Sequence, residues 1–173
     1  METTGDRQKQ PREGIERQLM LIDGEWTASS SGRLLPVETP ARREAVIAEV
    51  PRSAEADVDR AVKAAAKAFE SWKRLAPRDR GKAMLKIAAD IEARSEDIAK
   101  TLSLETGNAL RTQSRGEVAL AADLFRFYGG VASVQKGETV PLGAQGFCYT
   151  RRETIGGVAG SIPLYSPGPS GAP

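Results

Sequence analysis

Few side chains in this sequence are suited to nucleophilic, acid–base or metal chemistry. Its 173 residues include one cysteine, Cys148, and no histidine. A reactive thiolate needs a group that lowers its pKa, such as a histidine or a helix N-terminus, and neither lies near Cys148 in the sequence. We therefore interpret Cys148 as a structural or exposed thiol. Without histidine, the chain has no Ser-His or Cys-His pair and no histidine zinc site.

Two further groups of residues raise the question of ligand binding. Gly156, Gly157 and Gly160 resemble a phosphate loop only loosely, because their spacing is not G-x-G-x-x-G and Pro163 stands where a helix would follow. We interpret these glycines as positions of close packing on a buried strand. Arg111, Arg115 and Arg126 indicate a solvated helix face rather than a nucleic-acid patch, because positive and negative charges nearly balance. The residues thus predict no catalytic, cofactor-binding or metal-binding side chain.

Composition describes an ordinary globular chain with 40% hydrophobic and 28% charged residues. The net charge of +2 is too small to indicate a nucleic acid or an anionic membrane as partner. No apolar stretch approaches the roughly 20 residues of a membrane span, and the charged N-terminus does not resemble a secretory signal. We expect residues 1–18 to form a flexible arm. A single cysteine is consistent with a reducing compartment, so we expect a cytoplasmic protein.

The first third of the chain predicts short strands. Residues 19–22 and 25–27 flank Asp23-Gly24, a pair typical of tight hairpin turns. Residues 34–39 and 45–50 form a second predicted pair, with Pro36 tolerable at a sheet edge.

Four helices are predicted next. Ser53 is the expected N-cap of the first, Pro77 begins the second, Ser95 caps the third, and Gly107-Asn108 ends it. The fourth spans residues 111–132. Apolar side chains recur at steps of three and four in the first, second and fourth helices: Val58, Ala61, Val62, Ala65, Phe69 and Trp72; Met84, Ile87, Ala88 and Ile91; Val118, Ala121, Ala122, Phe125 and Tyr128. We interpret the aromatic members of these stripes as core rather than as a cofactor box.

The last third predicts a hairpin, one strand and an irregular tail. Residues 138–142 and 147–153 flank a glycine-containing loop, and alternation places Phe147, Tyr149, Arg151 and Glu153 on one side. Residues 155–162 form an apolar run typical of a buried strand. Prolines and glycines in residues 163–173 disfavour both helix and sheet. Because a parallel sheet is normally covered by helices on both faces, four helices with one such strand predict large exposed apolar patches.

Several motifs, in order along residues 19–162, resemble the NAD(P)-dependent aldehyde dehydrogenases. They are Leu21-Ile22-Asp23-Gly24-Glu25-Trp26, Val37-Glu38-Thr39-Pro40-Ala41, residues 57–62 with residues 64–69, Glu105-Thr106-Gly107, Phe125-Arg126-Phe127-Tyr128, Gly137-Glu138-Thr139-Val140-Pro141 and residues 152–158. The resemblance implies an α/β fold, the N-terminal portion of the aldehyde dehydrogenase fold with an incomplete Rossmann-like nucleotide-binding domain.

The resemblance also implies a division of the chain. Residues 19–135 correspond to the N-terminal layer of the nucleotide-binding domain, and residues 136–154 to an oligomerisation hairpin. Residues 155–162 correspond to the first strand of the parallel sheet, and residues 163–173 to an irregular tail. After that strand the family has a tryptophan and an asparagine where this chain has Leu164 and Tyr165. The asparagine's oxyanion role is not transferred to Tyr165, and we expect a truncated or frameshifted reading frame.

The family reaction is oxidation of an aldehyde to a carboxylic acid, with NAD or NADP accepting hydride from a cysteine thiohemiacetal. The resemblance places the nucleophilic cysteine, the general-base glutamate and the dinucleotide contacts beyond residue 173. The resemblance also suggests that Glu105 could bind a monovalent cation. The alternative interpretation, which we favour, is that Glu105 is a solvated carboxylate.

Three hypotheses follow for function. In the first, the chain is a catalytically silent aldehyde dehydrogenase fragment that binds no cofactor. In the second, it is an interaction module that forms homo- or hetero-oligomers with aldehyde dehydrogenase subunits through residues 136–154. The third and weakest is residual nucleotide binding without catalysis.

Overall fold

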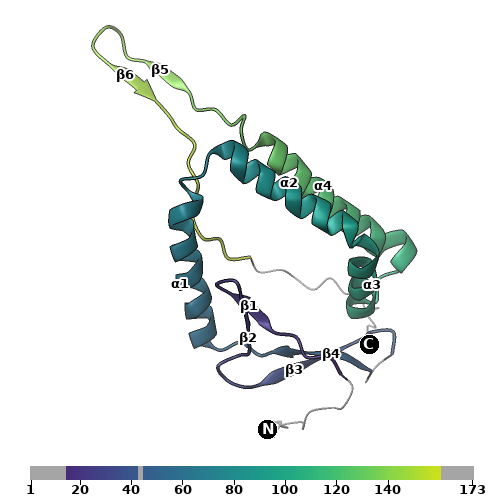
Figure 1. Ribbon diagram of the computed structural model, residues 1–173. Helices are drawn as coiled ribbons and strands as arrows, with labels where there is room; N and C mark the ends of the chain where they lie inside the picture. The colour runs from purple at the N-terminus through teal and green to yellow at the C-terminus, as the bar shows by residue number, and fades with distance from the viewer. Residues whose placement is uncertain (1–14, 43–44, 161–173) are drawn as a thin grey trace, which may run out of the picture. The chain divides into compact units, whose positions relative to one another are not determined.

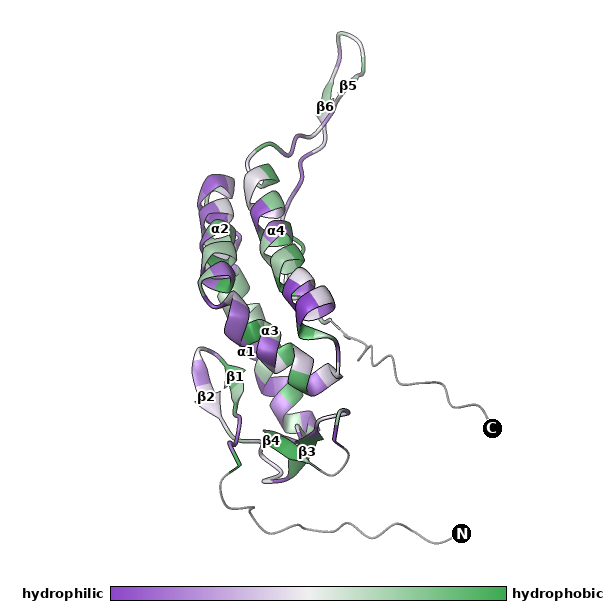
Figure 2. Cartoon of the chain, turned by 90° about the vertical axis from the view of Figure 1, so that its right-hand side faces the viewer, coloured by the Kyte–Doolittle hydropathy of each residue, from purple (hydrophilic) through white to green (hydrophobic). Residues whose placement is uncertain are grey.

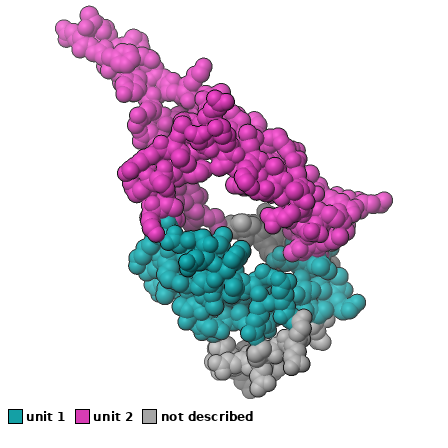
Figure 3. All heavy atoms as spheres, in the orientation of Figure 1, with its two compact units in different colours: residues 1–64, 104–107, 165–173 teal, residues 65–103, 108–164 magenta. Residues whose placement is uncertain are grey.

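The computed structural model describes residues 15–42 and 45–160. These residues fall into two compact units (Figure 3). The first contains residues up to 64 together with 104–107, and the second contains residues 65–103 and 108–164, of which residues up to 160 are described. Figure 1 shows the elements in chain order.

The first unit begins with the predicted hairpin, β1 (Met20–Ile22) and β2 (Glu25–Thr27), which pair antiparallel. Asp23 and Gly24 have φ values of 53° and 83°, the left-handed conformations that a type I′ turn requires at both central positions. The Asp-Gly signal in the sequence is therefore confirmed.

A second antiparallel pair is formed by β3 (Leu34–Glu38) and β4 (Val46–Pro51). β4 also contacts the end of the expected N-terminal arm. The Gln18 N–H donates to the Glu49 carbonyl at 2.8 Å, the Glu49 N–H donates to the Glu16 carbonyl at 3.0 Å, and the Arg17 guanidinium pairs with the Glu49 carboxylate at 3.2 Å. Residues 16–18 thus lie along β4, whereas residues 1–14 lie outside the described part.

Helix α1 (Glu55–Trp72) begins one residue later than an N-cap at Ser53 predicts. The Ser53 hydroxyl donates to the Met20 sulfur, and the Asp57 carboxylate instead accepts the Ala54 N–H at 2.9 Å. This contact is the reach-back half of a capping box, in which an acidic side chain at the third helical position binds the N-cap N–H. The predicted N-cap at Ser53 is therefore wrong.

The second unit contains α2 (Pro77–Ala93), part of α3 (Ser95–Thr106), the π-helix η1 (Leu110–Ser114) and α4 (Arg115–Val131). Pro77 begins α2 as predicted, and the predicted fourth helix is divided between η1 and α4. Gly107, with φ 77°, follows the end of α3 as the sequence predicts.

Helices α2 and α4 pack side by side through small residues. A Cβ atom built on Gly81 would lie 2.5 Å from the Gly129 carbonyl oxygen, so only glycine permits this approach. Ala88 of α2 and Val118 and Ala122 of α4 are buried. The core of this unit is therefore built mainly from alanine and glycine.

Most of the predicted apolar stripes are not core. Val58, Val62, Trp72, Ile87 and Tyr128 are exposed, and Phe69 and Phe125 are half-buried. Figure 2 shows the hydrophobic residues along the helices. The interpretation of the aromatic stripe as core packing is wrong for Trp72 and Tyr128, whereas the expectation of large exposed apolar surface is confirmed.

The chain forms no strand over residues 155–160. Ile155 and Val158 are 93% and 82% exposed, so the predicted buried strand over 155–162 is wrong for these residues. A strand needs a hydrogen-bonded neighbour, and none lies beside this segment within the described residues. The predicted tail at residues 163–173, with Leu164 and Tyr165, lies outside the described part.

Candidate functional site

The hairpin of β5 (Thr139–Pro141) and β6 (Phe147–Tyr149) is the best-formed candidate site. The strands pair antiparallel, with Thr139 opposite Tyr149, Val140 opposite Cys148, and Pro141 opposite Phe147. It is shorter than predicted because the pairing ends at Tyr149. Arg151 and Glu153 lie beyond the strand and form an ion pair with each other.

The base of the hairpin is held by Thr150. Its N–H donates to the Glu138 carbonyl at 2.8 Å, and its hydroxyl oxygen accepts the Glu138 N–H at 2.8 Å. A Cβ atom on Gly137 would collide with the Thr150 carbonyl oxygen. Glycine at position 137 therefore allows the two arms to close immediately below the strands.

The two faces of the hairpin differ. Phe147 and Tyr149 share one face, with ring centroids 5.8 Å apart, and are 77% and 63% exposed. Val140 and the half-buried Cys148 share the opposite face. Exposed aromatic residues are typical of binding surfaces, so this face is suited to contact with another protein.

The outer edges of the hairpin also differ. Hydrogen-bonded and non-hydrogen-bonded pairs alternate in an antiparallel ladder. Since Thr150 bonds to Glu138, the Phe147 and Tyr149 N–H groups point to the outer edge of β6. On β5 the residue opposite Phe147 is Pro141, which has no N–H to offer at its own outer edge. Within the described residues β5 and β6 pair only with each other (Figure 1), so β6 presents the better edge for addition of another strand.

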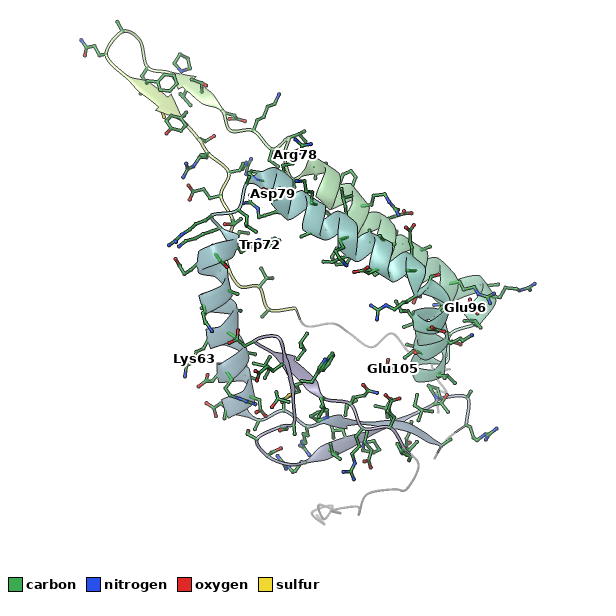
Figure 4. The ribbon with its side chains drawn as sticks, viewed as in Figure 1. Lys63, Trp72, Arg78, Asp79, Glu96 and Glu105 are labelled. Atoms are coloured by element: carbon green, nitrogen blue, oxygen red, sulfur yellow. The ribbon has the colours of Figure 1, made fainter. Side chains whose placement is uncertain are left out.

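The groups that sequence analysis considered for chemistry do not converge. Cys148 lies in β6 as a free thiol, and Glu105 is an exposed residue near the end of α3 (Figure 4). Within residues 15–42 and 45–160 no three acidic, cysteine or histidine side chains are grouped closely enough to hold a metal ion. The predicted close packing of Gly156, Gly157 and Gly160 on a buried strand is wrong for the described residues, because residues 155–160 form no strand and a Cβ atom on Gly160 would meet nothing within 4 Å. A Cβ atom on Gly157 would lie 3.6 Å from the Ala65 methyl group, an ordinary van der Waals contact.

The three predicted surface arginines lie on exposed positions of η1 and α4. The Arg115 guanidinium donates twice to the Glu96 carboxylate, at 2.8 and 2.9 Å, and this hydrogen bonding lowers the pKa of Glu96. Arg126 donates to Asp123 at 2.6 Å, and hydrogen bonding to Glu92 raises the pKa of Arg126. Arg115 and Arg126 are therefore already paired with carboxylates, which argues against a phosphate-binding face.

The described residues do not form a dinucleotide cradle. Such a cradle needs a strand, a glycine-rich turn and a helix whose N-terminus faces the pyrophosphate. The glycine-containing residues 156–160 are irregular instead, and Gly156 has a φ of 125°. These residues as described do not fit NAD or NADP.

The most strongly perturbed carboxyl group is Asp57, which is 1% exposed. Hydrogen bonding, first from the Ala54 N–H and then from Ser29, Ser30 and Arg60, holds the pKa of Asp57 far below its ordinary value. Nothing in the sequence pattern indicates the partners of Asp57 in the loop after β2. Because its oxygens are occupied by the fold, Asp57 has a structural role.

No helix in the described part of the chain is both long and apolar enough to cross a membrane. This agrees with the absence of a long apolar stretch in the sequence.

Comparison with known proteins identifies the family. The model of the aldehyde dehydrogenase family matches residues 26–167. An aldehyde dehydrogenase of Aspergillus niger is 37% identical over 144 residues, which are 83% of this chain and 28% of that protein. The crystal structure of NAD-dependent aldehyde dehydrogenase from Sinorhizobium meliloti aligns with a TM-score of 0.69 and 35% identity, over 73% of this chain and 25% of that one.

A second solved structure, PnpE in complex with nicotinamide adenine dinucleotide, aligns with a TM-score of 0.73 and 37% identity, over 78% of this chain and 27% of that one. The chain thus spans no more than about a third of the length of the relatives that it matches. The α/β architecture is that of the N-terminal portion of their fold. The chain belongs to the aldehyde dehydrogenase family.

Proposed function

We propose that this chain supplies an inter-subunit contact and does not oxidise aldehydes by itself. The observation that carries the proposal is the β5–β6 hairpin, with exposed Phe147 and Tyr149 on one face and an open edge along β6. An open edge with outward N–H groups accepts a strand from another chain. The partner is an aldehyde dehydrogenase subunit, either a second copy or a full-length relative, and the contact uses residues 136–154.

Catalytic silence is supported by the residues present. The family reaction needs a thiolate nucleophile, a general base and a bound nicotinamide. The one cysteine of the sequence is in the hairpin, and the described glycines form no dinucleotide cradle. A cytoplasmic location, supported by the single cysteine, belongs to the same proposal.

The activity test measures NAD(P)H formation by the purified chain with a panel of aliphatic and aromatic aldehydes. We expect no turnover above background. A rate near 1 per second, the low end for ordinary enzymes, would show that the chain is an enzyme in its own right.

The association test uses a tagged copy of the chain expressed together with a full-length homologue. We expect both to purify together, and deletion of residues 137–153 to abolish this. Size-exclusion chromatography with light scattering then gives the stoichiometry. Separate elution of the two intact proteins at micromolar concentration would contradict the proposal.

A further inference from the structure

Two adjoining cavities lie in the second unit, where α1 ends, α2 begins and residues 151–158 pass. Their volumes are about 430 and 570 Å³, within the range of small-molecule sites. They share the walls formed by Phe69, Arg80 and residues 152–154. A single ligand can therefore occupy both.

The larger cavity is cationic. Lys73, Arg80, Arg151 and Arg152 line it, together with Glu153. Lys73 is paired with Glu70 at 2.7 Å and Arg151 is paired with Glu153. Arg80 donates to the Leu75 carbonyl at 2.6 Å, so its charge has no anionic partner there. Arg152 makes no ion pair or hydrogen bond within the described residues, so the cavity carries excess positive charge.

The start of α2 strengthens this positive potential. Pro77, the first residue of α2, is part of the cavity wall, and no side chain caps this helix. The N-terminal end of a helix carries the positive end of its dipole. Figure 4 shows Arg78 and Asp79 at this end of α2 and Trp72 at the end of α1.

The smaller cavity is mainly apolar. Its walls include Trp72, Met84, Tyr128 and Val131, with Ile155 and Val158 from the irregular segment. Trp72 and Tyr128, which the sequence had indicated as core residues, are exposed beside it. The pair of cavities thus combines an apolar half with a cationic half.

We propose that these adjoining cavities bind a small organic phosphate, with the phosphate at Arg80 and Arg152 and its apolar group against Trp72 and Tyr128. Guanidinium groups bind phosphate oxygens through paired, charge-assisted hydrogen bonds. The apolar group gains by leaving water. The site shares Arg151, Arg152 and Glu153 with residues 136–154 of the proposed contact, whereas Phe147 and Tyr149 lie outside both cavities.

The test is calorimetric titration of the full chain with butyl phosphate and with inorganic phosphate, at low and at 0.5 M sodium chloride. Butyl phosphate should bind about tenfold more tightly than phosphate, because its methylene groups are buried. High salt should weaken both, because Arg152 is exposed and its charge is therefore screened. In a Trp26→Phe background the fluorescence of Trp72 should change on titration.

Two substitutions change the charge in opposite directions. Arg152→Gln should weaken butyl phosphate binding about tenfold, as expected for one lost charge-assisted contact. Glu153→Gln should tighten it several-fold, because it removes a competing carboxylate and releases Arg151. Arg111→Gln removes the same charge as Arg152→Gln but lies outside both cavities, and should leave binding unchanged. Circular dichroism confirms folding of each variant.

Three outcomes would overturn the proposal. One is no binding of butyl phosphate at 10 mM, a concentration above the millimolar affinity expected of a weak site. Another is an equal loss of affinity for butyl phosphate in Arg152→Gln and Arg111→Gln. Equal losses would mean that the net charge of the protein attracts the phosphate and that no specific site binds it. The third is tighter binding of NAD, whose pyrophosphate contains no phosphate monoester, than of butyl phosphate, which would indicate a nucleotide site instead.

Discussion

The carboxylate of Asp57 lies 2.8 Å from the hydroxyl group of Ser29 and accepts its hydrogen bond. The same carboxylate accepts the Ser30 N–H at 3.0 Å and the Arg60 guanidinium at 2.9 Å. One buried side chain on the first turn of α1 therefore fixes the loop that follows β2. Both segments belong to the first unit.

Replacing Asp57 with Asn should destabilise the first unit, because the amide brings a donor to a place where every partner is already a donor. A buried donor without an acceptor is costly. We expect the melting temperature to fall by about 5 °C or more, measured by circular dichroism. Asp59→Asn changes the same charge on an exposed position of the same helix and should leave the melting temperature within about 1 °C.

The pKa of Asp57 also predicts how stability depends on pH. Its pKa is lowered in the folded state, so its contribution to stability is fully present above the ordinary value of 3.8 and decreases as the pH falls below it. Urea unfolding of the wild-type chain should therefore lose stability steeply between about pH 4 and pH 2. Asp57→Asn should show a shallower loss over this interval, and parallel curves for the two proteins would contradict the assignment.

Local signals in the sequence predict the elements of this fold well. Asp23-Gly24, Pro77 and Gly107 mark a turn, a helix start and a helix end, because each depends on backbone conformations that few other residues adopt. The contacts of Asp57 with Ser29 and Ser30 depend instead on a loop distant in sequence, and periodicity alone does not reveal such partners. The same limit applies to Tyr128 and Trp72, whose helical spacing predicts an apolar face but not what covers it.

The contact of α2 with α4 gives a second stability test. Gly81→Ala should destabilise the chain by about 1–3 kcal/mol, because the new methyl group would lie 2.5 Å from the Gly129 carbonyl oxygen and force the helices apart. Gly130→Ala has open space around its Cβ position and should stabilise the helix by up to about 1 kcal/mol. Chemical denaturation of both variants measures the difference, and similar effects would contradict close helix packing here.

The hydroxyl group of Ser114 gives a test with the opposite sign. It is fully buried and has no hydrogen-bond partner among the described residues. Because an unpartnered buried hydroxyl has lost its hydration without compensation, Ser114→Ala should raise stability by about 0.5–1 kcal/mol. Thermal unfolding measures this change. A loss of stability would show that the hydroxyl is hydrogen-bonded in solution.

The hairpin illustrates how far sequence reasoning reaches toward the candidate site. Alternation over residues 147–153 places Phe147 and Tyr149 together, and the contact of their rings confirms it. The same alternation predicts a strand that extends to Glu153. The last cross-strand contact is that of Thr150 with Glu138 and Gly137, so the residues after Thr150 have no strand opposite them. The length of a strand depends on how far its partner strand extends, and the residue pattern of one strand does not reveal this.

The open edge of β6 yields the sharpest test of association. Tyr149→Pro removes an outward N–H without removing a hydrogen bond between β5 and β6, because the alternation of the ladder places the inward bonds at Cys148 and Thr150. We expect Tyr149→Pro to abolish co-purification with a full-length aldehyde dehydrogenase. Tyr149→Ala, which keeps the N–H and removes the ring, should weaken it by a smaller factor.

Comparing these two variants separates addition of a strand from contact through the aromatic face. If the aromatic ring made the contact, both variants would lose association equally, since both lack it. If the backbone edge makes it, Tyr149→Ala retains most of the complex. Cys148→Pro should disrupt the hairpin itself, because it removes an inward donor opposite Val140. Hydrogen exchange at the inward N–H groups of Val140 and Thr150 distinguishes this unfolding from a blocked edge.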